Sequence, residues 1–170
     1  MNKVYTLSFP EARNAVVSGD IHGDFNLLVY KLCVQYQMKD TVLIVAGDCG
    51  FGFEKKEYYE QMARRNAKRM NEANNWIVFV RGNHDNPLYF DGKQFKHKRF
   101  IAIPDYSILL ACKHTYFALV VGFQLIVVIA WRNGRNIAQR IECLPIQRIS
   151  LVRTFIGPMK LRFIMMKCSL

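Results

Sequence analysis

The sequence predicts an α/β domain built around a parallel sheet. Three short apolar runs (15–19, 42–46 and 76–80) have the length and composition of buried strands. Residues 24–37 and 54–73, which separate these runs, carry apolar residues at helical spacing. Alternation of strand and helix is typical of right-handed crossovers between parallel strands. The composition agrees, because 170 residues with 51% hydrophobic and 22% charged side chains can bury one real core.

Each predicted helix has one face that is expected to lie against the sheet, because residues three or four apart share a side of a helix. In 24–37 this face consists of Phe25, Leu28, Leu32 and Tyr36. In 54–73, a more polar helix, it consists of Tyr59, Met62, Asn66, Met70 and Ala73.

After a loop at 85–99, short apolar segments predict further strands, with a turn at Lys113-His114 between the last two. The predicted strands are 100–103, 107–112 and 116–121. Residues 123–170 show no clear periodicity and no helix caps, so no structure is predicted for them. The organised part of the chain is therefore expected to be 1–122, followed by a basic and hydrophobic tail at 123–170.

The net charge of +11 is concentrated in the last third of the chain. Residues 106–170 hold nine basic residues and one acid, Glu142, whereas residues 1–105 hold 15 basic and 12 acidic residues. A basic surface spread over the whole domain would indicate a nucleic-acid partner. With the charge confined mostly to the tail, nucleic acid is a possible partner but not the favoured one.

Cysteine usage and hydropathy predict a cytoplasmic protein without a membrane segment. The five cysteines are odd in number and form no CxxC pair, and the N-terminus does not resemble a signal peptide. Both features favour a reducing compartment. The apolar run Tyr116–Trp131 contains Gln124 and is shorter than the roughly 20 residues of a spanning helix, so a buried strand pair is predicted there.

Three motifs follow the first three predicted strands directly. They are Asp20-Ile21-His22, Gly47-Asp48 and Gly82-Asn83-His84-Asp85. Ligands of parallel sheets bind beyond the carboxyl ends of the strands, so the three motifs are expected to meet at one edge. Taken singly, Asp20 or Asp48 would be a helix cap or a turn residue. Together the motifs favour a metal site, because Asp, His and Asn suit Mn, Fe or Zn.

The motifs divide into metal ligands and catalytic residues. On an extended backbone Asp20 and His22 would point to the same side and hold one metal ion. Asp48 has two carboxylate oxygens and can bridge two ions, and Asn83 offers an amide oxygen to the second. Two such ions can clamp a phosphoryl group and bind a hydroxide that acts as the nucleophile.

The residues after Asn83 supply the predicted catalytic groups. His84 lies next to a metal ligand and can protonate the leaving oxygen as a general acid. Asp85 is expected to orient the His84 imidazole.

In order and spacing, the DxH, GD and GNHD motifs resemble the calcineurin-like metallophosphoesterase superfamily, and the stretch from Asn86-Pro87 to Ser107 resembles a bacterial branch of it. The resemblance covers about residues 1–122. It implies a four-layer sandwich of mixed sheets flanked by helices, and hydrolysis of a phosphomonoester or phosphodiester with two divalent metal ions. By the same match Asp20, His22, Asp48 and Asn83 would hold the metals and His84 would be catalytic.

Two departures from the family pattern suggest that the site is incomplete. No second Asp follows Asp48 in the GD motif, and no histidine follows His114, where the family has further metal ligands including GHxH. Read one base earlier, a back-translation of 123–132 can encode a string like the family's next strand, which suggests a shifted reading frame. Two hypotheses remain: a phosphoesterase impaired by lost ligands, or a non-catalytic remnant that binds phosphate or nucleic acid.

Overall fold

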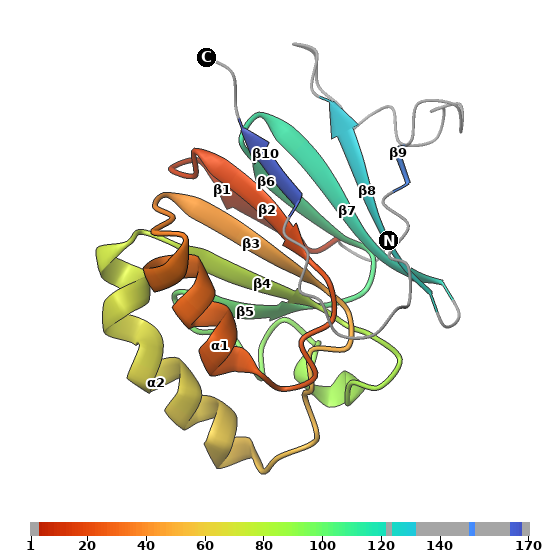
Figure 1. Ribbon diagram of the computed structural model, residues 1–170. Coiled ribbons are helices and arrows are strands. Elements are labelled where there is room, and N and C mark those ends of the chain that lie inside the picture. The colour runs from red at the N-terminus through yellow and green to blue at the C-terminus, as the bar shows by residue number, and fades with distance from the viewer. Residues whose placement is uncertain (1–3, 122–123, 132–149, 152–163, 168–170) are drawn as a thin grey trace.

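The computed structural model describes residues 4–121, 124–131, 150–151 and 164–167. Two five-stranded sheets pack face to face, and the helices cover the outer face of one of them (Figure 1). The predicted α/β class, with mixed sheets and flanking helices, is confirmed. These elements make three of the four expected layers, and helices outside the second sheet are not among the elements of the described residues.

The sheet next to the helices contains the parallel strands predicted from the apolar runs. β2, β3, β4 and β5 are all parallel, and β10 pairs antiparallel with β2. Their bounds, in spatial order, are β10 Ile164–Lys167, β2 Asn14–Ser18, β3 Thr41–Ala46, β4 Trp76–Val80 and β5 Phe100–Ile103. The carboxyl ends of β2 to β5 therefore share one edge.

The second sheet has one parallel pair, β1 with β6, and is otherwise antiparallel. In spatial order it consists of β1 Thr6–Phe9, β6 Ser107–Ala111, β7 His114–Val121, β8 Gln124–Trp131 and β9 Ser150–Leu151. β1 was not predicted from the sequence. The predicted turn lies one residue earlier, at Cys112-Lys113.

The apolar run Tyr116–Trp131 forms most of β7 and all of β8, and these two strands pair along their whole length. None of the helices within the described ranges has the length and apolar character needed to cross a bilayer.

The helices follow the prediction, with shorter bounds. α1 spans Phe25–Tyr30 and continues as a π-helical turn, η1, over Lys31–Gln35; α2 spans Lys56–Glu72, and a 3₁₀ turn, η2, spans Pro87–Tyr89. Tyr36 was expected on the inner face but is exposed. A π turn has more residues than an α turn, so it carries Tyr36 out of phase with Leu32. The other predicted inner residues are buried, except Ala73, which is half-buried past the helix end.

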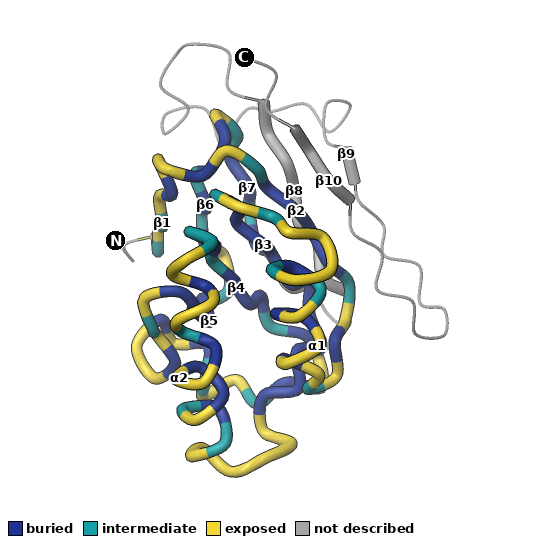
Figure 2. Tube along the Cα trace, turned by 60° about the vertical axis from the view of Figure 1, so that its left-hand side comes forward, coloured by how far each residue is buried: buried dark blue, intermediate teal, exposed yellow. Residues whose placement is uncertain are grey.

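The parallel strands are mostly apolar because both of their faces are buried (Figure 2). Successive side chains alternate between the two faces of a strand. Leu43 and Val45 of β3 pack against the helices, whereas Val42 and Ile44 pack against the second sheet. Packing on both faces holds β2, β3 and β4 in register, and thereby fixes the loops that leave their carboxyl ends.

Candidate metal centre

The loops that leave β2, β3 and β4 meet at one edge of the sheet, as predicted. The main-chain N–H groups of Ile21 and His22 donate to the carbonyl oxygen of Asp48, at 3.3 and 3.0 Å. The next pair continues the contact, with the Gly23 N–H donating to the Cys49 carbonyl oxygen at 2.8 Å. The first two motifs are thus joined through their main chains, so their side chains start from fixed positions.

Asp20 and His22 face one another, but for a different reason than the sequence suggested. His22 Nε2 lies 2.9 Å from Asp20 Oδ2. The segment is a turn rather than an extended strand, and His22 has a positive φ of 43°. The two side chains therefore do not meet through the alternation of an extended strand. They meet because His22 adopts a left-handed conformation, which costs about 1–3 kcal/mol of backbone strain. Such strain in a non-glycine residue is common at binding sites.

The Asp20–His22 pair fits a divalent ion in its chemistry. A carboxylate oxygen and an imidazole nitrogen are donors that suit Mn, Fe or Zn. The two atoms face one another at 2.9 Å as an ion pair. Both side chains are partly exposed, at 55% for Asp20 and 35% for His22, so an ion can reach them.

Asp48 stands at the centre of the three loops. It also has a positive φ, of 44°, and its Oδ1 accepts a hydrogen bond from the His84 N–H at 3.2 Å. Gly82 makes this approach possible, because a Cβ on Gly82 would collide with the Asp48 main-chain nitrogen and with Oδ1. Asp48 is thereby held between the first and third motifs, where a bridging carboxylate is expected.

Asp85 has a different role from the one predicted. Its carboxylate is buried and accepts four main-chain N–H bonds, all between 2.7 and 2.9 Å: Cys49 and Gly82 donate to Oδ2, and Gly50 and Phe51 donate to Oδ1. Within the described residues no hydrogen bond joins Asp85 to the His84 ring. Asp85 therefore clamps the loop after Asp48 to the loop that carries His84, rather than orienting the imidazole.

Cys49, between Asp48 and the clamp, is not a metal ligand in its observed state. Its thiol is fully buried and donates to the Val80 carbonyl oxygen at 3.4 Å. Burial first, and then the neighbouring Asp85 carboxylate, raise the pKa of this thiol well above its ordinary value. Metals bind the thiolate, so Cys49 acts as a packing residue.

Asn83 and His84 are exposed at the same edge. The His84 ring centroid lies 6.5 Å from that of His22, with the two planes tilted by 58°. The structure thus brings together the loops that carry all six residues singled out in the sequence, while the Asp85 carboxylate bonds to main-chain N–H groups. Among the described residues no group of three or more His, Cys, Asp and Glu side chains lies close enough together to hold a metal ion. The donors present fit part of a divalent metal site.

One ion pair beside the motifs was missed by the sequence reasoning. Arg81 Nη2 lies 2.7 Å from Asp105 Oδ2, and Nε donates to Oδ1 at 3.4 Å. The hydrogen bond to Asp105 raises the pKa of the Arg81 guanidinium. The pair ties the end of β4 to the end of β5. A usable signal was present, since Arg81 directly precedes the GNHD motif and Asp105 follows the predicted strand 100–103.

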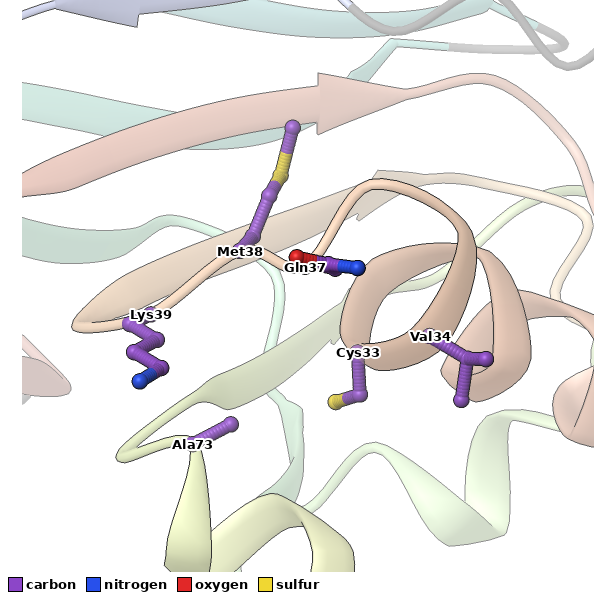
Figure 3. A pocket seen from close by; sticks show the side chains of 6 residues that line it. All are labelled: Cys33, Val34, Gln37, Met38, Lys39 and Ala73. Carbon is purple, nitrogen blue, oxygen red and sulfur yellow. The ribbon is translucent and has the colours of Figure 1, made fainter.

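A cavity of about 350 Å³ lies away from the motifs (Figure 3). Its lining residues precede β3 and β4 or belong to the end of η1, so it opens at the amino ends of the parallel strands. They are Cys33, Val34, Gln37, Met38, Lys39 and Ala73. The cavity is therefore separate from the candidate metal centre.

Comparison with known families agrees with the motifs. A family model described as calcineurin-like phosphoesterase matches residues 14–162, which include all three motifs and continue past residue 122. Comparison with curated proteins and with solved structures gave no match. The matched range covers most of the chain, and the loops that it includes carry the donors expected of a metal-dependent phosphoesterase. The chain belongs to the calcineurin-like phosphoesterase family.

Proposed function

We propose that this protein hydrolyses a phosphomonoester or phosphodiester at the edge where the three motif loops meet. One observation carries the proposal: a carboxylate–imidazole pair at 2.9 Å, the Asp48 carboxylate and the exposed His84 imidazole lie on loops joined by hydrogen bonds. Those groups combine metal donors with a proton donor at one place. The family match supports a phosphoesterase and does not distinguish the substrates.

In this proposal Asp20 and His22 would hold one of two divalent ions, Asn83 would hold the other, and the Asp48 carboxylate would serve both. Bound Mn, Fe or Zn would supply Lewis acidity toward the phosphoryl oxygens and lower the pKa of water. The chain's own part is to keep these donors in place through the Asp85 clamp. His84 donates a proton to the leaving oxygen; its exposed ring is free to meet a substrate while its main chain is held by Asp48.

The test is hydrolysis of p-nitrophenyl phosphate and bis(p-nitrophenyl) phosphate with added Mn²⁺, Fe²⁺ or Zn²⁺, alongside metal content per chain. We expect Asp48→Asn and His84→Asn each to lower kcat/KM by about 100-fold or more. Asp91→Asn is the matched control, because Asp91 is an exposed turn residue whose Oδ1 accepts from Lys93 and Gln94. Activity that persists after a chelator has removed the metal would contradict the proposal.

A second candidate function follows from the incomplete donor set of the described residues. Missing ligands lower metal affinity and misplace the nucleophile, so turnover would be weak. The chain would then act as a phosphate- or nucleic-acid-binding remnant. Binding that falls steeply with salt, without turnover in any metal, favours this candidate. Sequencing the gene for a histidine-containing shifted frame beyond residue 122 tests the cause.

We also propose a cytoplasmic location. Cys33 and Cys49 are free thiols, which suits a reducing compartment. The location is tested by labelling the protein in intact cells and comparing the signal with that in purified compartments.

A further inference from the structure

Two large apolar side chains are exposed on the motif loops. Phe53, five residues after Asp48, is 53% exposed, and Leu88, four residues after His84, is 66% exposed. The fold does not use them: the aromatic core beneath is made by neighbours such as Phe51, which is fully buried and packs edge-on against Phe25, Phe79 and Phe90. Phe53 and Leu88 are therefore free to contact something other than the protein.

Phe53 and Leu88 lie on either side of a contact between the second and third motif loops. A Cβ on Gly52 would lie 2.6 Å from Asn86 Cβ, so the chain preceding Phe53 rests directly on the residue two before Leu88. The Asn86 N–H also donates to the Phe51 carbonyl oxygen at 2.7 Å. Phe53 and Leu88 thus emerge from one junction of the second and third motif loops.

Phe53 also lies beside the first motif. Its Cδ2 atom would be 3.9 Å from a Cβ on Gly23, the residue that follows His22. Gly23 itself has no side chain that could pack against this edge of the ring. The exposed ring therefore borders the loop that carries the Asp20–His22 donor pair, and lies on a loop clamped by Asp85 to the loop of His84.

We propose that Phe53, with Leu88 on the adjoining loop, contacts a flat ring in the leaving group of the phosphate ester. The preferred substrates are then aryl or nucleoside phosphates rather than esters of small aliphatic alcohols. The inference rests on the proposed function, since it places the phosphate at the donor pair. Flat rings gain from offset or edge-on contact with an exposed Phe, and an aliphatic neighbour completes an apolar surface.

The first experiment measures binding, so that it does not depend on turnover. Calorimetry compares phenyl phosphate with methyl phosphate on the full chain with Mn²⁺. We expect phenyl phosphate to bind about three- to tenfold more tightly. The Phe53→Ala variant is expected to lose the preference for phenyl phosphate. Phe53→Leu is expected to keep little of this preference, and Phe53→Trp to keep it.

Tyr30→Ala is the matched control. Tyr30 is an aromatic side chain of similar exposure, 48%, on α1 rather than on a motif loop. This variant is expected to keep the preference for phenyl phosphate. Adenosine 5′-monophosphate forms a second arm: a Phe53-dependent gain for the nucleotide alone identifies a nucleoside ester, and a gain for phenyl phosphate alone identifies an aryl ester.

The second experiment measures kcat/KM for the same esters. Phe53→Ala is expected to lower kcat/KM about three- to tenfold for the ring-bearing ester, through KM, and to leave the methyl ester within about twofold. Turnover with an equal loss on both esters overturns the inference and spares the proposed function. Phe53-dependent binding without turnover supports the inference and overturns the proposed function. Equal binding of methyl phosphate, phenyl phosphate and adenosine 5′-monophosphate by the unaltered chain overturns the inference whether or not hydrolysis occurs.

Discussion

The main-chain N–H of His84 donates a hydrogen bond to the Oδ1 atom of Asp48, at 3.2 Å. The residue expected to bridge the metals therefore also holds the residue expected to protonate the leaving group. An asparagine at position 48 keeps an oxygen that can accept this bond while it removes the charge. For this reason Asp48→Asn reports on metal binding more cleanly than Asp48→Ala, which would release the His84 loop as well.

The Asp85 clamp predicts a large effect on stability. Asp85→Asn replaces one acceptor oxygen with an amide group that faces two main-chain donors, and burial leaves those donors without water. We expect the free energy of unfolding to fall by about 2–4 kcal/mol. Urea denaturation measures it, with Asp91→Asn as the exposed control. An unchanged unfolding midpoint would show that the clamp is dispensable.

Gly82 predicts a steric effect at the metal centre. Gly82→Ala places a Cβ against the Asp48 nitrogen and Oδ1, so the two loops must separate. We expect a loss of about 1–3 kcal/mol in stability and about a tenfold loss in Mn²⁺ affinity. Gly19→Ala is the matched control, because its Cβ would meet nothing within 4 Å. Equal effects of the two substitutions would refute the steric explanation.

The Arg81–Asp105 pair predicts an energetic coupling between the ends of β4 and β5. Both side chains are about one quarter exposed, so solvent weakens their attraction but does not remove it. A double-mutant cycle with Arg81→Met and Asp105→Asn is expected to give about 1 kcal/mol. The measurement is the unfolding free energy of the four proteins. Additive losses from the single substitutions would mean that the bidentate contact contributes nothing.

The cysteines predict an order of chemical reactivity. Burial raises the pKa of both the Cys49 and Cys33 thiols above the ordinary value of a cysteine, so each is slow to alkylate. Cys33 is half-buried and Cys49 is fully buried, so Cys33 reacts first and its rate rises as pH increases toward its raised pKa. Mass spectrometry after iodoacetamide treatment identifies the labelled residue. Labelling of native Cys49 at the rate of Cys33 would contradict the buried position.

Several elements could be predicted from the sequence because their signal is local. β4 and β5 have the predicted bounds, Trp76–Val80 and Phe100–Ile103, since parallel strands buried on both faces appear as continuous apolar runs. The three motifs follow such strands directly, so their meeting at one edge follows from the topology. β1 was missed because Thr6–Phe9 is short and mostly unburied and pairs with β6, about a hundred residues away.

The sequence by itself determined the fold class and the family and predicted the donors, because apolar runs and motif spacing are local features of the chain. Only the tertiary structure decided what each residue does. Asp85 accepts hydrogen bonds from four main-chain N–H groups, three of them more than 30 positions away. Nearly every residue has a main-chain N–H group, so these partners cannot be identified from the sequence. His22 meets Asp20 through a left-handed turn that the Asp48 carbonyl oxygen helps to hold, and that bond exists only once β2 and β3 have paired.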